Sequence, residues 1–179
     1  MCLSRKAQEE ELKESDEWLS SLQYLSANIN DLTISESFLD PSSEFSGIND
    51  PAIKMLRWKA DKPSNFAIKG NSKHITDSLG WYTDVPVTLK DKDDKTVTVI
   101  KNFVCIDNGK TEPMLFFGMS NIRKVQGIPN SNKNQFRIKL HEKAYIIPTF
   151  SKAPVVKNLA KKGPYDSSLT SENSLKKSV

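Results

Sequence analysis

One acidic residue stands where an apolar segment gives way to a turn. Asp40 directly follows Phe38 and Leu39, and it begins the segment 40–44, of sequence DPSSE. A carboxylate at the end of an apolar strand, beside small hydroxyl residues, is placed for acid–base chemistry. The same segment also suits a simple turn, because Asp, Pro and Ser are favoured in tight turns. On local grounds alone the turn interpretation is favoured.

Other residues that carry chemistry are few or poorly spaced. His74 and His141 lie far apart, and neither has a cysteine or second histidine at the spacing of a metal site. No serine has the flanking glycines of a nucleophile elbow, and no glycine-rich loop is present to cradle a phosphate. Cys105 lies in an apolar segment, which predicts a buried and inert thiol. We therefore expect neither a metal nor a cofactor.

Length and composition narrow the class of protein. The chain has 179 residues, 37% of them hydrophobic and 27% charged, which predicts one domain with tails. No apolar run approaches a length of about 20 residues, which a membrane-spanning helix needs. The first residues lack the apolar core of a secretory signal, and two cysteines cannot form a disulfide framework. We expect an intracellular, cytoplasmic protein without a membrane partner, and leave open that the sequence is a fragment of a longer polyprotein.

Charge divides the chain into three zones. Residues 1–22 have a net charge of −3 and predict an acidic helical or linker segment. Residues 23–150 show the pattern of a folded domain. Residues 151–179 mix Pro, Gly, Ser and Lys without periodicity and predict a basic, mostly disordered tail. Because the tail lysines are dispersed and no aromatic residues alternate with them, nucleic acid is not the partner that we favour.

The middle zone consists of many short predicted strands. Asn49 followed by Pro51 predicts the start of a helix, with Ile53, Leu56 and Trp58 on one face. Residues 120–125 predict a second short helix, and residues 30–31 and 90–95 predict turns. This pattern indicates a mostly-β, small barrel-like fold with one or two short helices. The predicted strands are 24–29, 32–39, 45–48, 66–68, 81–89, 97–106, 114–117, 136–140 and 144–147.

The order of these features resembles the retropepsin-like aspartic proteases, above all the protease domains of LTR-retrotransposon polyproteins. In that family two apolar residues followed by Asp-Thr/Ser-Gly open the active-site loop, and a later motif of apolar residues and Gly packs beside it. The residues Phe38-Leu39-Asp40 match the start of the first motif, and Phe116-Phe117-Gly118 match the second. Segments 80–81, 85–89 and 102–107 add to the resemblance, which spans about residues 24–147. It implies a small closed barrel of the acid protease type, with residues 66–81 as its flap between Gly70 and Gly80.

The resemblance also implies a chemistry that needs two carboxylates. Two close carboxylates share one proton: the ionised one deprotonates a water that attacks the peptide carbonyl, and the protonated one donates to the carbonyl oxygen. This chain offers one such loop, so the second carboxylate would be Asp40 of a second copy. The implied function is a homodimeric aspartic endopeptidase in polyprotein self-processing, with a peptide or the polyprotein as substrate.

The loop after Asp40 departs from the family motif at two positions. Pro41 replaces the Thr or Ser whose hydroxyl ties the two loops together across the dimer, and Ser42 replaces the Gly that gives backbone freedom. Ser43 offers a hydroxyl one position later. These differences keep a second function open, a non-catalytic dimerisation or interaction domain. A third is a small β-barrel that binds nucleic acid, with stacking side chains drawn from Trp58, Trp81, Tyr82 and Phe103.

Overall fold

The computed structural model describes residues 22–64, 67–69 and 75–155. The predicted acidic segment and the predicted basic tail therefore lie almost wholly outside the described residues. The helices are α2 (Asp50–Leu56), α3 (Met119–Lys124) and a short 3-10 helix, η1 (Ser131–Lys133). The strands are β1 (Gln23–Tyr24), β2 (Ala27–Ile29), β3 (Leu32–Ile34), β4 (Glu36–Asp40), β5 (Gly47–Asn49), β6 (Ala67–Lys69), β7 (Ile75–Lys90), β8 (Thr96–Ile106), β9 (Met114–Gly118), β10 (Ile128–Asn130), β11 (Gln135–Leu140) and β12 (Lys143–Pro148).

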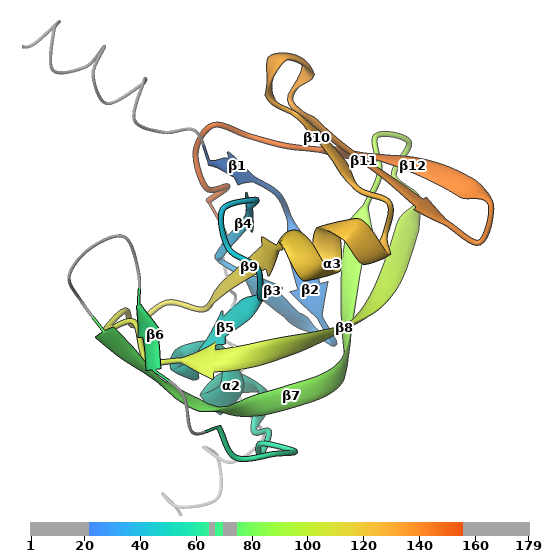
Figure 1. Cartoon of the computed structure of the whole chain (residues 1–179). Coiled ribbons are helices and arrows are strands. Elements are labelled where there is room, and N and C mark those ends of the chain that lie inside the picture. The colour runs from blue at the N-terminus through green and yellow to red at the C-terminus, as the bar shows by residue number, and fades with distance from the viewer. Residues whose placement is uncertain (1–21, 65–66, 70–74, 156–179) are drawn as a thin grey trace, which may run out of the picture.

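One curled sheet forms most of the molecule (Figure 1). Its strand order is β1-β4-β9-β5-β8-β7-β2-β3, with β6 paired to β7 beside this path. The long β7–β8 hairpin carries two register shifts, at Ser78/Gly80 and at Tyr82/Val85. Because a bulge increases the local twist of a strand pair, these shifts curl the sheet. The prediction of a mostly-β, barrel-like fold is confirmed.

Two of the predicted strands are each divided in two. Residues 24–29 form parts of β1 and β2, and residues 32–39 form β3 and most of β4. β2 and β3 make a hairpin around Asn30, whose φ of +52° is a conformation that Asn tolerates well. β1 pairs instead with β4. The division depends on these separate partners, so the local alternation of apolar residues could not predict it.

The core lies inside the curled sheet. Val85, Val87 and Leu89 of β7 are at most 2% exposed, as their alternate spacing predicted. Phe103 of β8 is fully buried, and its ring contacts that of Phe117 edge to face, at 5.9 Å between centroids. Burial of these side chains supplies the main driving force for closing the sheet.

Helix α2 begins where the sequence predicted. The side chain of Asn49 accepts the N–H of Ala52, which leaves one fewer unpaired donor at the helix N-terminus. The helix ends at Arg57, whose left-handed φ of +56° turns the chain. Ile53 is buried in the core, and Trp58 packs against the core from the residues that follow the helix.

A second sheet follows α3, at the upper right of Figure 1. Its strands β10, β11 and β12 are antiparallel, and their inner side chains Phe136, Ile138 and Ile147 are at most 1% exposed. β10 was not predicted, because its three residues show no alternation of apolar and polar types. No helix within residues 22–64, 67–69 and 75–155 is long and apolar enough to cross a membrane.

Candidate active site

Asp40 is the last residue of β4, and its neighbour across the sheet is Gly118. β4 and β9 run parallel, with Leu39 opposite Phe117 and Asp40 opposite Gly118. The two motifs that the sequence singled out therefore end side by side at one edge of the sheet. The Asp40 side chain is half-buried at this edge, so it is held by the sheet and still reachable from solvent.

A tight turn follows Asp40 and positions its carboxylate. The N–H of Ser43 donates to the carbonyl oxygen of Asp40 at 3.1 Å, and Pro41 occupies a turn position that its fixed φ suits. Both the N–H and the hydroxyl of Ser42 donate to Oδ1 of Asp40, at 3.2 and 2.5 Å. The hydroxyl of Ser43 donates instead to the carbonyl of Phe45 at 2.9 Å. Ser42, rather than Ser43, therefore orients the carboxylate, since the turn directs Ser43 away from it.

The loop after this turn is held by the first residues of α3. The N–H of Met119 donates to the carbonyl of Ser43 at 2.7 Å, and the N–H of Ser120 donates to that of Glu44 at 3.0 Å. These are donors that a helix leaves unpaired at its N-terminus, so the loop carbonyls complete their pairing. The hydroxyl of Ser46 accepts the N–H of Gly118 at 2.8 Å. Three hydrogen bonds thus fix the loop to the β9–α3 junction.

Gly118 allows this loop to approach closely. A Cβ added there would lie 1.9 Å from the carbonyl oxygen of Phe45 and 2.8 Å from that of Ser43. Its φ of −82° is open to any residue, so space rather than backbone conformation demands glycine. The sequence motif that ends in Gly118 therefore has a local physical reason in this structure.

Aromatic side chains cover the face of the sheet beside Asp40. Phe38 and Asp40 point to the same side of β4, because alternate residues of a strand share a face. The ring of Phe38 stacks on that of Phe116 at 5.8 Å, and Phe45 contacts Phe116 edge to face at the same distance. A Cβ at Gly47 would overlap the Phe116 ring, so this glycine makes room for it. The carboxylate therefore adjoins a partly exposed aromatic surface.

The segment that the resemblance placed as a flap contains a hairpin. Residues 67–69 of β6 pair with residues 75–77 of β7, while Gly70 lies outside the described residues. Gly80 lies in β7 with a φ of +147°, and a Cβ there would lie 2.6 Å from that of Ala60. Gly80 is therefore required both by its backbone conformation and by the close approach of the 60–62 segment.

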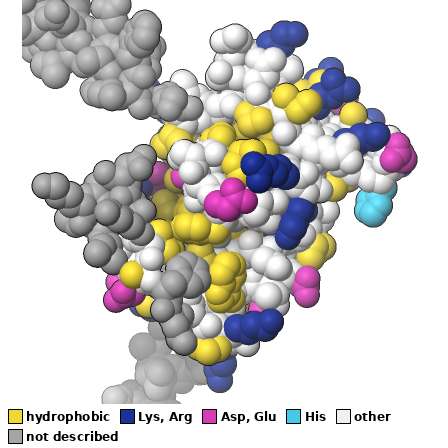
Figure 2. Space-filling model, in the orientation of Figure 1, with side chains coloured by type: hydrophobic (Ala, Val, Ile, Leu, Met, Phe, Trp, Pro, Cys, Tyr) yellow, Lys and Arg dark blue, Asp and Glu magenta, His cyan; other side chains and the backbone are white. Residues whose placement is uncertain are grey.

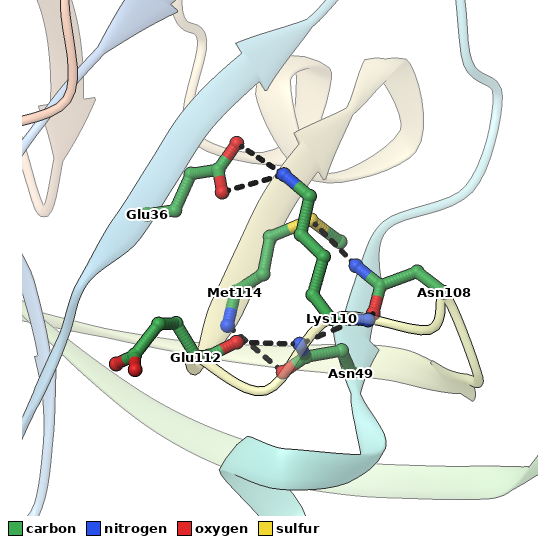
Figure 3. A network of polar contacts seen from close by, with 6 residues as sticks. All are labelled: Glu36, Asn49, Asn108, Lys110, Glu112 and Met114. Atoms are coloured by element: carbon green, nitrogen blue, oxygen red, sulfur yellow. Dashed lines mark hydrogen bonds and ion pairs between the residues drawn. The ribbon is translucent and has the colours of Figure 1, made fainter.

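A buried asparagine ties the helix α2 to the strand that carries Gly118 (Figure 3). Oδ1 of Asn49 accepts the N–H of Met114 at 2.8 Å as well as that of Ala52, and its Nδ2 donates to the carbonyl of Glu112 at 2.8 Å. Beside it, the ammonium of Lys110 contacts both carboxylate oxygens of Glu36 at 2.9 and 2.7 Å. Sequence reasoning found the helix-capping role of Asn49 but missed this second role. The long-range partner in the loop before β9 leaves no local signal.

The other residues that the sequence singled out, a cysteine and several aromatic side chains, are mostly buried. Cys105 is 1% exposed, and burial raises the pKa of its thiol to about 11, which suits the predicted inert side chain. Phe103 and Tyr82 are buried, and the rings of Trp58 and Tyr82 stack at 6.5 Å. The buried rings of Phe103 and Tyr82 are core residues and present no open face for stacking on bases. Within the part of the chain that the structure describes, no group of three His, Cys, Asp or Glu side chains is placed to hold a metal ion.

The curled sheet, with its paired β4 and β9 ends, is a retropepsin-like fold. The structure is similar to the retroviral protease-like domain of Ddi1 from Leishmania major, with a TM-score of 0.51 and 15% identity, over 72% of this chain and 94% of that chain. It also matches EIAV protease, solved with the inhibitor HBY-793, at a TM-score of 0.42 and 16% identity, over 63% of this chain and 95% of that chain. No protein-family model matches the sequence, and neither does any curated protein. The likeness to the Ddi1 domain shows the fold and leaves the activity to be argued from the site.

Proposed function

We propose that this chain is an aspartic endopeptidase domain that acts as a homodimer. The observation that carries the proposal is the formed turn at Asp40. Its carboxylate lies at the end of β4, opposite Gly118, and Ser42 orients Oδ1 through two hydrogen bonds. A carboxylate held at an accessible sheet edge is the group that such chemistry needs.

The arrangement within one chain supplies half of an acid–base pair. Oδ2 of Asp40 has no hydrogen-bond partner among the described residues, so it is open to a water or to a second carboxylate. A second copy, related by a two-fold axis, would bring its own Asp40 to the same place. The two groups would then share one proton. One would take a proton from the attacking water, and the other would donate to the peptide carbonyl oxygen.

The surroundings of Asp40 support a peptide substrate with apolar side chains. The partly exposed rings of Phe38 and Phe45, with Phe116 between them, lie on the Asp40 side of the sheet. Apolar side chains next to the cleaved bond would lose water against these rings. Together with the family resemblance, this supports self-processing of a retrotransposon-type polyprotein as the biological reaction.

A second candidate is a non-catalytic dimerisation or interaction domain. The observation that favours it is Pro41, because proline has neither a hydroxyl nor an N–H to tie two loops together across a dimer. The hydroxyl of Ser42 is already bonded to Asp40 of its own chain. In this case the same fold would serve association alone.

Self-cleavage of a longer precursor tests the first candidate against the second. We expect a precursor that contains this chain to cleave itself, and the Asp40→Asn variant to remain intact on gels and by mass spectrometry. Asp31→Asn is the matched control, since Asp31 is exposed in the β2–β3 turn. A precursor that never cleaves, or an Asp40→Asn precursor that cleaves like the wild type, would favour the non-catalytic domain.

Mixing the two forms tests the homodimer. If both Asp40 carboxylates are needed, an equal mixture of wild type and Asp40→Asn leaves about a quarter of the dimers with two Asp40 residues. The activity per wild-type chain should therefore fall to about half when dimers exchange freely. Activity that stays unchanged on mixing would mean that one chain suffices.

A further inference from the structure

The positive charge of the described chain is concentrated in its C-terminal part. Residues 119–155, which contain α3 and the β10–β12 sheet, hold seven basic residues and one acidic residue, a net charge of +6. Residues 23–118 have a net charge of −2. In Figure 2 several dark-blue side chains and few magenta ones lie at the upper right, over the β10–β12 sheet. The net charge of residues 119–155 is therefore higher than that of the whole chain, which is +4.

Most of these cations have no acidic partner. Arg123 pairs with Glu44 at 3.4 Å, and Lys139 pairs with Glu142 at 3.1 Å. No other basic side chain of residues 119–155 forms an ion pair with a described residue, and all of them are exposed. The nearby β7–β8 turn holds three lysines and three aspartates, so it adds no net charge. Unpaired cations of one sign on one surface attract a polyanion.

Three of these cations and Lys101 of β8 make up what we call the basic face: Lys101, Lys124, Arg137 and Lys139. Arg137 and Lys139 alternate with the buried Phe136 and Ile138, so both point outward from β11. The N–H of Lys139 donates to the carbonyl of Val125 at 2.8 Å, which joins β11 to the end of α3 beside Lys124. The basic face therefore crosses from the sheet to the helix.

Lys101 extends this face from β8 and is unusually placed. It is 9% exposed, and its side chain forms no hydrogen bond or ion pair with a described residue. Burial, and then the nearby charge of Lys124, lower its pKa. The stem of Lys101 is buried, while its Nζ still reaches solvent near the charge of Lys124. Two neighbouring ammonium groups repel each other, and an anion that joins them relieves this repulsion. Lys101 is thus an observation, independent of the charge count, that points to a bound anion.

We infer that the basic face binds the phosphate backbone of a nucleic-acid duplex. Its cations are spread along the surface rather than converging on one point, which suits a polymer of phosphates. Arg137 and Lys139 are two residues apart on a strand, about 6.6 Å, close to the axial advance of two phosphates on one strand. A membrane surface would need apolar side chains that enter it. Of the large, strongly exposed apolar side chains in the described residues, only Ile128 lies within strands β10–β12, and a single such side chain is a weak membrane anchor.

The test measures binding of a fluorescent 24-base-pair DNA duplex by anisotropy at several salt concentrations. With three to four phosphate contacts, log K should fall with log salt at a slope of about −3. The double variant Lys124→Gln/Arg137→Gln should lose about two units of that slope and at least tenfold in affinity at low salt. Lys59→Gln/Lys62→Gln, on the loop after α2, has the same net charge and should bind within twofold of wild type.

Lys101 is tested with the variant Lys101→Met. We expect the slope to become less steep by about one unit, and the melting temperature to stay the same or rise, because an unpaired charge near that of Lys124 is removed. Three results would overturn the proposal: no binding at low salt, an equal loss in the control pair, or tighter binding to vesicles of anionic lipid than to the duplex. The proposal does not depend on peptidase activity, and Asp40→Asn should bind the duplex like the wild type.

Discussion

Gly118→Ala should destabilise the protein strongly. Among the described glycines whose φ is negative and whose added Cβ would meet backbone atoms, Gly118 has the closest contact. The new Cβ would stand 1.9 Å from the carbonyl oxygen of Phe45, whereas real Cβ atoms essentially never approach within 3.0 Å. The atoms in the way are backbone, so a side-chain rotation cannot relieve the overlap. The loop after Asp40 must move, and this puts the three hydrogen bonds that tie it to the β9–α3 junction at risk.

The expected cost follows from these contacts. Overpacking a filled site costs about 1–3 kcal/mol, and each lost hydrogen bond costs about 1 kcal/mol. A total of about 4 kcal/mol is a large part of the stability of about 5–15 kcal/mol that is typical of a domain. With a urea m-value of about 2 kcal/mol per molar, the midpoint of unfolding should fall by about 2 M.

Gly109→Ala is the matched control for this variant. Gly109 has a left-handed φ of +69° and no atom within 4 Å of an added Cβ, so it tests backbone strain without crowding. Its expected cost is about 1 kcal/mol, or about 0.5 M in the urea midpoint. Far-UV circular dichroism against urea gives both midpoints. If Gly118→Ala unfolds at the wild-type midpoint, or no earlier than Gly109→Ala, the close approach of the loop is not what this glycine permits.

Two further predictions concern buried groups. Asn49→Ala should lower the free energy of unfolding by about 3 kcal/mol in a urea titration, because it leaves the buried N–H of Met114 unpaired and uncaps α2. A loss below about 1 kcal/mol would argue against the acceptor role of this side chain. Cys105 should resist iodoacetamide at pH 8 until urea unfolds the chain, as peptide mass spectrometry would show. Folding raises the pKa of this thiol to about 11. The contribution of the protonated thiol to the free energy of unfolding is therefore fully present below about pH 9 and should be lost as the pH rises towards 11. In Cys105→Ala the free energy of unfolding should fall less between about pH 9 and pH 11 than in the wild type. An identical fall in the two proteins would contradict this prediction.

Local patterns predicted the elements whose causes are local. The alternation of Val85, Val87 and Leu89 predicted a half-buried strand, and Asn49 with Pro51 predicted the start of α2, because a cap and a fixed φ act within one turn. Predictions were wrong where the partner strand decides the boundary. β1 and β2 are separate strands because β1 pairs with β4 at one end of the sheet order, whereas β2 pairs with β3 at the other end.

The sequence by itself determined the mostly-β pattern, the turn chemistry after Asp40 and the two motifs whose order resembles the retropepsin-like proteases. Each depends on residue types that act on their immediate neighbours. Only the tertiary structure decided that Asp40 and Gly118 are cross-strand neighbours and that Ser42 orients the carboxylate. It also decided that Lys101, in β8, lies near the charge of Lys124, in α3. These relations join segments far apart in the chain, and a strand pairing is set by the burial of a whole face rather than by any local run of residues.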